Sequence, residues 1–333
     1  MTSRVVFFSE GSANIGLGHI TRCVSLAQAF AEHALPCRFV INGDAHVHQI
    51  RELENCDNMD WTHLADFACY LRPRDIAIVD SYLAPVECFE RIIQTVALLL
   101  CVDDFFRIEY PPAAVILNGT FGIDAKAPDP LKERSLFGSR FIPLRKPFWD
   151  VPPRACGSCA GSVLVTFGGE DARGLTVPVV DALLHTFVDL EIHAVIGAAY
   201  HGGRPAAHPR LFLHHNLSAG EMCDLMLRCD LAVSAAGQTL YELARTGCPT
   251  VAVKIAENQH NNFLGALSLG VLDQQCGVDA TILSRDSVIQ SVLGAIQLLR
   301  CREKRTQLAT NAQHHVDGQG ARRVAKHVTS ALS

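Results

Sequence analysis

Short apolar runs alternate with stretches of helical periodicity along the first half of the chain. The first run, residues 5–9, ends in a glycine-containing loop. Beyond the loop, apolar side chains at positions 20, 23, 24, 27 and 30 share one face of a helix with a 3.6-residue period. Further apolar runs follow at residues 38–41, 75–79, 96–102 and 115–117. Strands that are apolar throughout and alternate with helices indicate a parallel sheet covered by helices on both faces.

A proline-rich segment with neither strand nor helix periodicity interrupts this alternation of strands and helices. The alternation then starts again. Prolines gather between residues 143 and 153, and no strand or helix period appears before residue 161. The later strands are predicted at residues 163–167, 192–196, 230–234 and 250–253, with helices from about residue 175, after Ser218, at 240–246, and from Ser284 to residue 299. We therefore expect an N-terminal lobe at residues 1–145, a linker at 146–159 and a C-terminal lobe at 160–333.

Length, charge and cysteine content narrow the class of protein. The 333 residues exceed the length of about 250 at which single cores stop growing, which favours two lobes. The net charge of -5 includes no basic block, so nucleic acid is not an expected partner. No apolar run approaches the ~20 residues of a membrane span. The thirteen cysteines lie mostly in apolar stretches, as buried free thiols do, which indicates a reducing cytoplasm. The oligomeric state stays open.

Three patterns raise the question of a metal. Cys156 and Cys159 form the one CxxC, but no second ligand pair accompanies them, and no histidines form an HExxH. Asp103 and Asp104 are adjacent, but neighbouring side chains on a strand point to opposite faces. We interpret the two aspartates as loop shaping or substrate contacts, and we expect neither a metal nor a cofactor.

The first loop offers a candidate base. The loop between the first strand and the following helix contains Gly16, Gly18 and His19. Because glycine has no side chain, the backbone of this loop can approach a ligand closely. The dinucleotide fingerprint GxGxxG is absent, because Thr21 stands at the third glycine position. The positive end of the helix dipole disfavours a charged imidazolium at residue 19, and a neutral ring can act as a general base. The alternative is a histidine that only caps the turn.

Two turns of the C-terminal lobe have the composition of phosphate-binding sites. Residues 168–171 (Gly-Gly-Glu-Asp) follow one strand, and residues 236–239 (Ala-Gly-Gln-Thr) open a helix whose free N–H groups suit an anion. Such donors stabilise a diphosphate leaving group without Mg²⁺. Structural turns are the alternative, because tight turns need the same glycines. Glu242, one turn into the helix, either accepts hydrogen bonds from ribose hydroxyls or is an ordinary exposed glutamate.

Polar residues at other strand ends suit a sugar. Residues 80–82 (Asp-Ser-Tyr) and Asp104 end two strands of the N-terminal lobe and are expected to face a cleft. Asn258 and Gln259 follow a strand of the second lobe, and amides suit sugar hydroxyls and acetamido groups. The alternative for Asn258 is the N-cap of the next helix.

A series of short motifs, in order along the chain, resembles the PseG/SpsG family, which includes the UDP-2,4-diacetamido-2,4,6-trideoxy-β-L-altropyranose hydrolases. The matching residues are Gly16-Leu-Gly-His-Ile-Thr-Arg22, Val79-Asp-Ser-Tyr82, Val102-Asp-Asp104, Leu144-Arg145 with Phe148, Phe167-Gly-Gly-x-Asp171, Ser234-Ala-Ala-Gly-Gln-Thr-x-x-Glu242, Gly247-x-Pro249 and Ala256-Glu-Asn-Gln259. The resemblance implies an α/β GT-B fold, with two Rossmann-like parallel-sheet lobes facing a central cleft, as in MurG-type glycosyltransferases.

The same resemblance implies an activity and a set of site residues. A UDP-linked diacetamido-trideoxyhexose is hydrolysed to the free sugar and UDP in nonulosonic (pseudaminic) acid biosynthesis, for flagellin or surface glycans. Water attacks the anomeric carbon with inversion. His19 is the implied base, and Tyr82 and Asn258 position the sugar and its leaving oxygen. The implied substrate-binding residues are Gly16, Gly18, Arg22, Asp104, Gly168, Gly169, Asp171, Gly237, Gln238, Thr239, Glu242 and Gln259.

The chain departs from the family pattern at three places. Gly174 stands where the family has Asn, residues 117–119 (Leu-Asn-Gly) replace a stretch with aspartate and glutamine, and Lys146 and Pro147 alter the LRPEF-like segment. A related UDP-sugar, or a CMP-linked sugar, stays open as the substrate. The alternatives in function are a GT-B glycosyltransferase with a UDP- or CMP-sugar donor and a non-catalytic protein that binds the nucleotide sugar.

Overall fold

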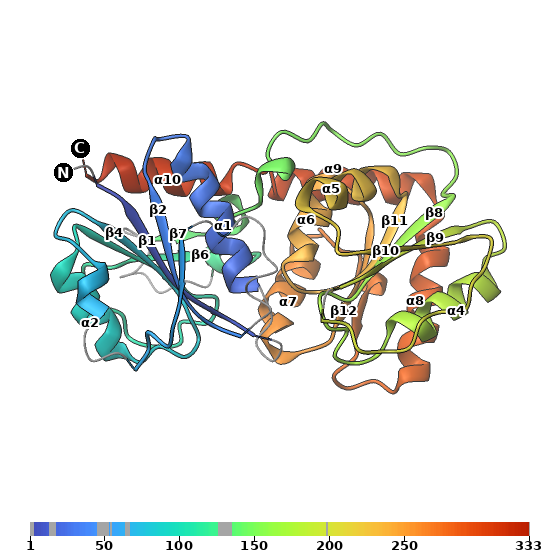
Figure 1. Cartoon of the computed structure of the whole chain (residues 1–333). Helices are drawn as coiled ribbons and strands as arrows, with labels where there is room; N and C mark the ends of the chain where they lie inside the picture. The colour runs from blue at the N-terminus through green and yellow to red at the C-terminus, as the bar shows by residue number, and fades with distance from the viewer. Residues whose placement is uncertain are drawn as a thin grey trace. The chain divides into compact units, whose positions relative to one another are not determined.

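The computed structural model of the chain describes residues 3–12, 18–44, 53, 55–63, 67–125, 135–197 and 199–332. Backbone contacts divide the chain into two units, residues 1–146 with 319–333, and residues 147–318. Each unit is built on one parallel sheet with helices on its faces (Figure 1). The predicted α/β class with two Rossmann-like sheets is therefore confirmed.

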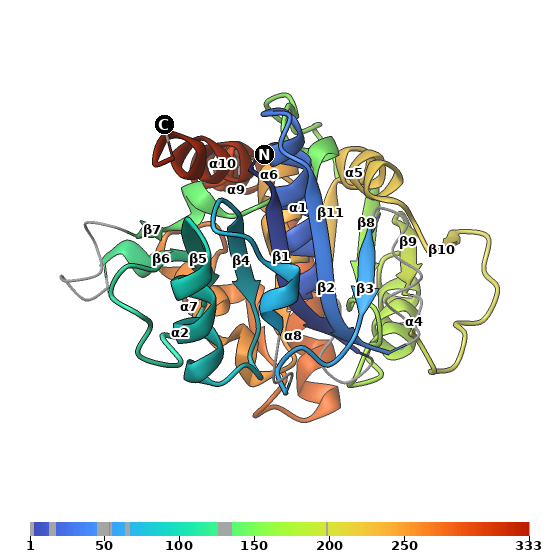
Figure 2. The same ribbon diagram turned by 60° about the vertical axis from the view of Figure 1, so that its left-hand side comes forward.

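The first unit holds a sheet of seven strands in the order β3-β2-β1-β4-β5-β6-β7. Figure 2 shows these strands in the reverse order, from β7 at the left to β3 at the right. Its strands and α-helices are β1 (Val5–Gly11), α1 (Gly18–Ala31), β2 (Cys37–Gly43), β3 (Cys56–Asn58), β4 (Ile76–Asp80), α2 (Val86–Thr95), β5 (Leu98–Val102), β6 (Val115–Asn118), β7 (Leu136–Phe137) and α10 (Gly320–Ser330). Short 3-10 helices lie at Phe67–Tyr70, Ile123–Ala125 and Ser139–Phe141, and one at Lys146–Phe148 joins the units.

Alternation along the strands gives the first sheet two buried faces. Val6 and Phe8 of β1 belong to a core cluster that also contains Phe89 and Ile92 of α2. Val5 and Phe7 are equally buried but point to the other face, where α1 packs on β1. Because both faces are covered, β1 is apolar at four consecutive positions, from Val5 to Phe8.

The last helix, α10, packs in the first unit, whereas the sequence places residues 160–333 in one lobe. Gly320 allows this packing, because a Cβ there would lie 2.1 Å from the carbonyl oxygen of Ile142. Arg322 also donates to both carboxylate oxygens of Glu32, the residue directly after α1, each at 2.9 Å. The chain therefore returns to its first sheet after residue 318.

The second unit holds a sheet of six parallel strands in the order β10-β9-β8-β11-β12-β13. Its strands and α-helices are β8 (Ser162–Thr166), α4 (Thr176–Thr186), β9 (Glu191–Ile196), β10 (Leu211–His215), α5 (Ala219–Arg228), β11 (Leu231–Ala235), α6 (Thr239–Thr246), β12 (Thr250–Lys254), α7 (His260–Ser268), β13 (Gly277–Asp279), α8 (Arg285–Leu299) and α9 (Arg302–His315). Two 3-10 helices lie at Glu257–Gln259 and Gln274–Cys276.

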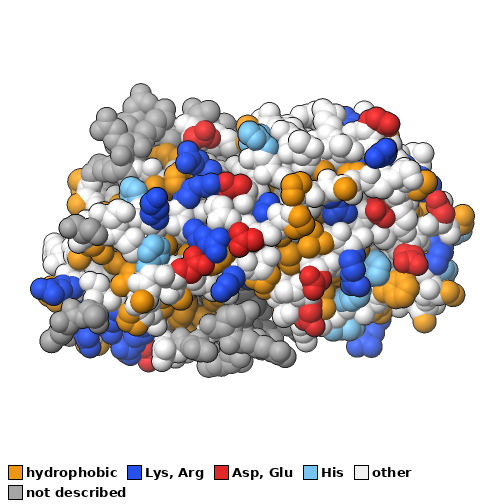
Figure 3. All heavy atoms as spheres, turned by 90° about the horizontal axis from the view of Figure 1, so that it is seen from above, with side chains coloured by type: hydrophobic (Ala, Val, Ile, Leu, Met, Phe, Trp, Pro, Cys, Tyr) orange, Lys and Arg blue, Asp and Glu red, His pale blue; other side chains and the backbone are white. Residues whose placement is uncertain are grey.

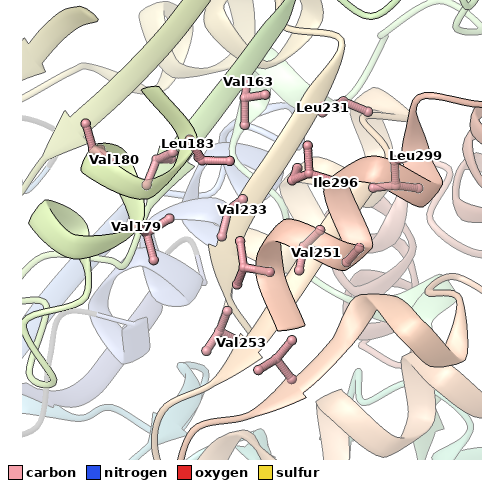
Figure 4. Packing of buried hydrophobic residues seen from close by; sticks show 14 of the residues in the cluster. Val163, Val179, Val180, Leu183, Leu231, Val233, Val251, Val253, Ile296 and Leu299 are labelled. Atoms are coloured by element: carbon pink, nitrogen blue, oxygen red, sulfur yellow. The ribbon is translucent and has the colours of Figure 1, made fainter. Parts of the chain in front are cut away.

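One hydrophobic cluster of the second unit lies between its sheet and helices α4 and α8. Figure 4 shows members of this cluster, among them Val233 and Val253 of the strands, Leu183 of α4 and Ile296 of α8. All four side chains are buried. This packing leaves the carboxyl ends of the strands to carry polar turns.

Candidate functional site

The first candidate cluster lies at the carboxyl edge of the first sheet. After β1 the chain builds β2 and β3 on one side, and β4 then pairs with the other side of β1. Ligands of such sheets bind at this switch in strand order. His19 and Arg22 stand in the first turns of α1, directly after β1, and Asp80 is the last residue of β4. The pairing of β4 with β1 therefore brings together His19 and Asp80, which are 61 positions apart in the sequence.

Asp80 fixes the hydrogen on the imidazole of His19. Burial alone would raise the pKa of Asp80, but the charge of Arg22 and the hydrogen bonds from His19 and Arg22 hold it below its usual value. Nδ1 of His19 lies 2.5 Å from Oδ1 of Asp80 and 3.2 Å from Nη2 of Arg22. An ionised carboxylate only accepts hydrogen bonds, and its contact with Nδ1 is the shorter of the two, so Nδ1 donates to Asp80. In the neutral ring, Nε2 then carries the lone pair. This is the arrangement by which an aspartate orients a histidine base.

The side chains around His19 form a closed ring of contacts. Arg22 donates to Asp80 at 2.9 and 2.7 Å and to Asp104 at 2.5 Å. Asp104 also accepts from the Tyr82 hydroxyl at 3.1 Å, and the Tyr82 ring meets His19 edge-on with centroids 4.2 Å apart. Burial, followed by the charge of Asp104, raises the pKa of Tyr82 well above its usual value, so the phenol stays a donor. Two carboxylates and one guanidinium leave the ring with a net negative charge.

Glu10 supports this ring and was missed by the sequence reasoning. Its carboxylate is fully buried at the end of β1 and accepts from the backbone N–H of Tyr82 at 2.6 Å and of Leu83 at 3.2 Å. The hydroxyl of Ser81 donates to it as well. An acidic residue directly after an apolar strand and before a glycine loop is the signal that could have found it. Glu10 therefore holds the turn that carries Tyr82.

The sequence suggests loop shaping or substrate contact for Asp103 and Asp104, and the two residues differ in what they contact. Asp103 accepts from the backbone N–H of Phe105 at 2.8 Å and of Arg107 at 2.7 Å, so it shapes the loop after β5. Asp104 turns to the ring instead. In the part of the chain that the structure describes, no three His, Cys, Asp or Glu side chains come together as a metal site requires.

The start of α1 is only partly described. Gly16 lies outside the described residues. Gly18 is the exposed first residue of α1, and nothing lies within 4 Å of the position that its Cβ would take. His19, by contrast, is only 5% exposed, because Asp80 and Tyr82 pack against its ring.

The first glycine turn of the second unit follows β8. Gly168 has a φ of +82°, and Asp171 accepts from the backbone N–H groups of Leu175 and Thr176 at 2.9 and 2.8 Å. Asp171 thus holds the turn against the start of α4. The backbone of Gly169 contacts the backbone of Gly197. A Cβ on Gly197 would lie 2.4 Å from the backbone of Gly169. The turn is fixed from both sides.

Gly174 stands where the PseG/SpsG family has Asn, and its backbone adopts a conformation that Asn also adopts. Its φ is +60°, and glycine and asparagine are the residues that adopt this region most readily. Nothing lies within 4 Å of the position of a Cβ there. This difference therefore concerns the side chain and not the path of the chain.

The second glycine turn follows β11, which pairs with β8 in the middle of the sheet. Gly237 and Gln238 come before α6, and Thr239 is its first residue. The side-chain nitrogen Nε2 of Gln259 lies 3.6 Å from the position that a Cβ of Gly237 would take. Glu242 is 4% exposed, so it is not the exposed helix glutamate of the alternative interpretation. Both turns lie at the strand-order switch of this sheet.

Asn258 lies in the 3-10 helix Glu257–Gln259 and is exposed. Helix α7 begins at His260 with Gln259 as its N-cap, so the alternative of Asn258 as N-cap is wrong. Gln259 accepts from the backbone N–H of Ile255 through Oε1 at 2.9 Å. The two amides therefore differ in their surroundings. Asn258 faces solvent, whereas Gln259 holds the end of β12.

The face of the molecule seen in Figure 3 is mixed in charge. Basic and acidic side chains lie interspersed on the face in Figure 3. Among the described residues, no helix has the length and apolar character needed to cross a membrane.

Comparison with known proteins supports the family resemblance and shows the fold. No family model matches. A protein of Helicobacter pylori named as pseudaminic acid cytidylyltransferase and UDP-2,4-diacetamido-2,4,6-trideoxy-beta-L-altropyranose hydrolase is 26% identical over 262 residues, which cover 78% of this chain and 46% of the relative. An uncharacterized protein of Methanocaldococcus jannaschii is 22% identical over 285 residues, covering 78% and 57%. The chain spans about half the length of these curated relatives.

Solved structures with the same fold cover nearly the whole chain. MurG of Acinetobacter baumannii superposes with a TM-score of 0.67 at 14% identity, covering 98% of this chain and 99% of MurG. The glycosyltransferase SnogD of Streptomyces nogalater gives 0.61 at 17% identity, covering all of both chains. MnaA of S. aureus in complex with UDP gives 0.63 at 12% identity, covering 99% and 97%. The chain therefore has the GT-B fold and resembles the PseG/SpsG family.

Proposed function

We propose that this protein hydrolyses a UDP-linked diacetamido-trideoxyhexose to the free sugar and UDP. The observation that carries the proposal is the pair formed by His19 and the buried Asp80, which leaves Nε2 of the imidazole as a base. The name of the Helicobacter pylori relative includes this hydrolase activity, which supports the choice of sugar. The reaction would belong to pseudaminic acid biosynthesis.

The first unit supplies the groups that act on the sugar. In the proposed step, Nε2 of His19 takes a proton from water while the water oxygen bonds to the anomeric carbon. The bond from that carbon to the phosphate oxygen breaks, and its electrons stay with UDP. Positive charge develops on the sugar ring in such displacements, and the net negative charge of Asp80, Asp104 and Arg22 favours it. Tyr82 contacts the sugar beside the base.

The second unit binds the nucleotide in this proposal. The backbone N–H groups at Gly168 and Gly169 and at the start of α6 receive the diphosphate, as helix N-termini do. Glu242 accepts from the ribose hydroxyls, and Gln238 and Thr239 line the same turn. Asn258 and Gln259 hydrogen-bond the sugar or its leaving oxygen. The charge of UDP is met by these donors, and no metal ion takes part.

The deciding experiment follows nucleotide release from UDP-, CMP- and GDP-sugars, with and without a chelator. We expect release of UDP with water as the acceptor, unchanged by the chelator and abolished in a His19→Ala variant. Release that requires an added sugar, lipid or peptide acceptor would show a glycosyltransferase instead. Binding of the nucleotide sugar without turnover would show a binding protein. Loss of activity with the chelator would contradict the metal-free step.

A further inference from the structure

A buried lysine in the second unit has no role in the mechanism above. Lys254 ends β12, and its side chain is 4% exposed. Its ammonium lies 3.0 Å from a carboxylate oxygen of Glu257, 3.3 Å from one of Asp279 and 3.3 Å from Nδ1 of His260. Burial alone would lower the pKa of Lys254, but the hydrogen bonds to Glu257 and Asp279 raise it. Lys254 is therefore a charged donor.

This contact determines which nitrogen of His260 carries the hydrogen. An ammonium donates and never accepts, so Nδ1 of His260 must accept. The neutral ring then has its hydrogen on Nε2. The arrangement is the opposite of the pair in the first unit, where Asp80 takes the hydrogen of Nδ1 and leaves Nε2 of His19 as an acceptor. One histidine is set as a base and the other as a donor.

The residue before His260 lies close to the turn proposed for the diphosphate. His260 is the exposed first residue of α7, which packs against β12 (Figure 1). The preceding residue, Gln259, reaches the turn before α6, with Nε2 3.6 Å from the Cβ position of Gly237. The backbone N–H of Ile255 fixes the other end of the same amide. Gln259 thus brings the start of α7 close to this turn.

We propose that His260, held in its tautomer by Lys254, donates a hydrogen bond from Nε2 to the phosphate oxygen that leaves the sugar. This inference rests on the proposed function. As the bond between the anomeric carbon and the phosphate oxygen breaks, negative charge gathers on that oxygen, and a fixed donor stabilises it. No proton is transferred, and UDP leaves as the anion. His260 is a catalytic residue in this step, and Lys254 is a positioning residue.

Two substitutions of His260 separate the donor from the side chain as a whole. In His260→Gln, the amide nitrogen reaches about as far as Nε2 and still donates. In His260→Asn, the shorter amide can still face Lys254 but no longer reaches the substrate. We expect His260→Asn to lower kcat by roughly 100-fold, as loss of one donor to a developing oxyanion does, and His260→Gln to recover most of it. Because residue 260 is exposed, both variants should keep the thermal stability of the wild type.

Lys254→Met tests the positioning role. The variant removes the ammonium and frees the tautomer of His260, so kcat should fall in the wild-type background but not further in the His260→Asn background. The matched control is Lys304→Met, which removes a lysine paired with Asp273 at 2.5 Å elsewhere in the unit and should leave kcat unchanged. A double-mutant cycle reads this coupling even where Lys254→Met also lowers stability.

The possible results are distinct. If the wild type releases UDP and His260→Asn does so at the same rate, the role of His260 is wrong while the proposed function stands. Equal losses in His260→Asn and His260→Gln would also contradict the donor role. If the wild type releases no UDP from any UDP-sugar, the proposed function itself is wrong and this inference falls with it.

Discussion

Replacement of Asp80 by Asn changes one atom of the site and tests both its chemistry and its packing. Asp80 is fully buried and accepts one hydrogen bond from His19 and two from Arg22. The asparagine amide has one oxygen and an N–H₂ group that only donates. His19 would then accept through Nδ1 and carry its hydrogen on Nε2, where the proposed base needs a lone pair.

Loss of an oriented base and loss of a buried ion pair each have a characteristic size. General-base catalysis contributes about 100- to 10,000-fold, and kcat should fall within that range when the lone pair is lost. Breaking a buried ion pair costs about 3–5 kcal/mol of unfolding free energy, and we expect about 3 kcal/mol because Asp104 still neutralises Arg22. Both losses come from a change that leaves the volume of the side chain almost the same.

The assay combines urea unfolding with UDP release, for the wild type, Asp80→Asn and a control. The control is Asp189→Asn, which breaks an exposed pair with Arg300 in the second unit and should leave both readouts close to the wild type. An Asp80→Asn variant with wild-type kcat would refute the assignment of His19 as an oriented base. Wild-type stability would refute the view that the buried ring is held by its charges.

Three further predictions follow from the same contacts. The pKa of Asp80 is lower in the folded than in the unfolded chain, so its contribution is present above the unfolded value of about 4 and is lost as the pH falls toward the folded value; the difference in unfolding free energy between wild type and Asp80→Asn should shrink over that range, and a constant difference would contradict it. Gly174→Ala should lower stability by about 1 kcal/mol and Gly174→Asn by less, because the φ of +60° strains a residue with a Cβ; equal midpoints in thermal unfolding would contradict this. Glu10→Ala should lower kcat/KM by about 100-fold through displacement of Tyr82, whereas Glu10→Gln keeps an acceptor for the backbone N–H groups and should retain most activity; similar kinetics for the two variants would count against the positioning role.

The sequence predicted the central strands of both sheets and missed the edges. Each predicted strand is present within two residues of its expected bounds. The four missed strands, β3, β7, β10 and β13, are the two edges of each sheet. Edge strands are short or half exposed, so they lack the continuous apolar run that marks a strand buried on both faces. Phe212 of β10, for example, is 42% exposed.

The partners of the candidate residues could not be predicted from the sequence, although the residues themselves stand at strand ends. His19 and Asp80 meet because β4 pairs with β1, and nothing local in the sequence gives that strand order. Lys254 was missed because a charged residue at a strand end gives no sign of what it will contact. The place of Glu10 before the glycine loop could have marked that residue, but not its contacts with the turn at residues 81–83. The return of α10 to the first sheet was also invisible, because its packing depends on a close approach at Gly320.

The position of bond cleavage tests the central claim most directly. The protein would be incubated with a UDP-linked diacetamido-trideoxyhexose in ¹⁸O-labelled water, and the isotope in the released UDP read by mass spectrometry. Attack of water at the anomeric carbon, with His19 as the base, predicts UDP that carries no ¹⁸O. UDP with one ¹⁸O atom would show attack at phosphorus and contradict the account, as would the absence of any UDP.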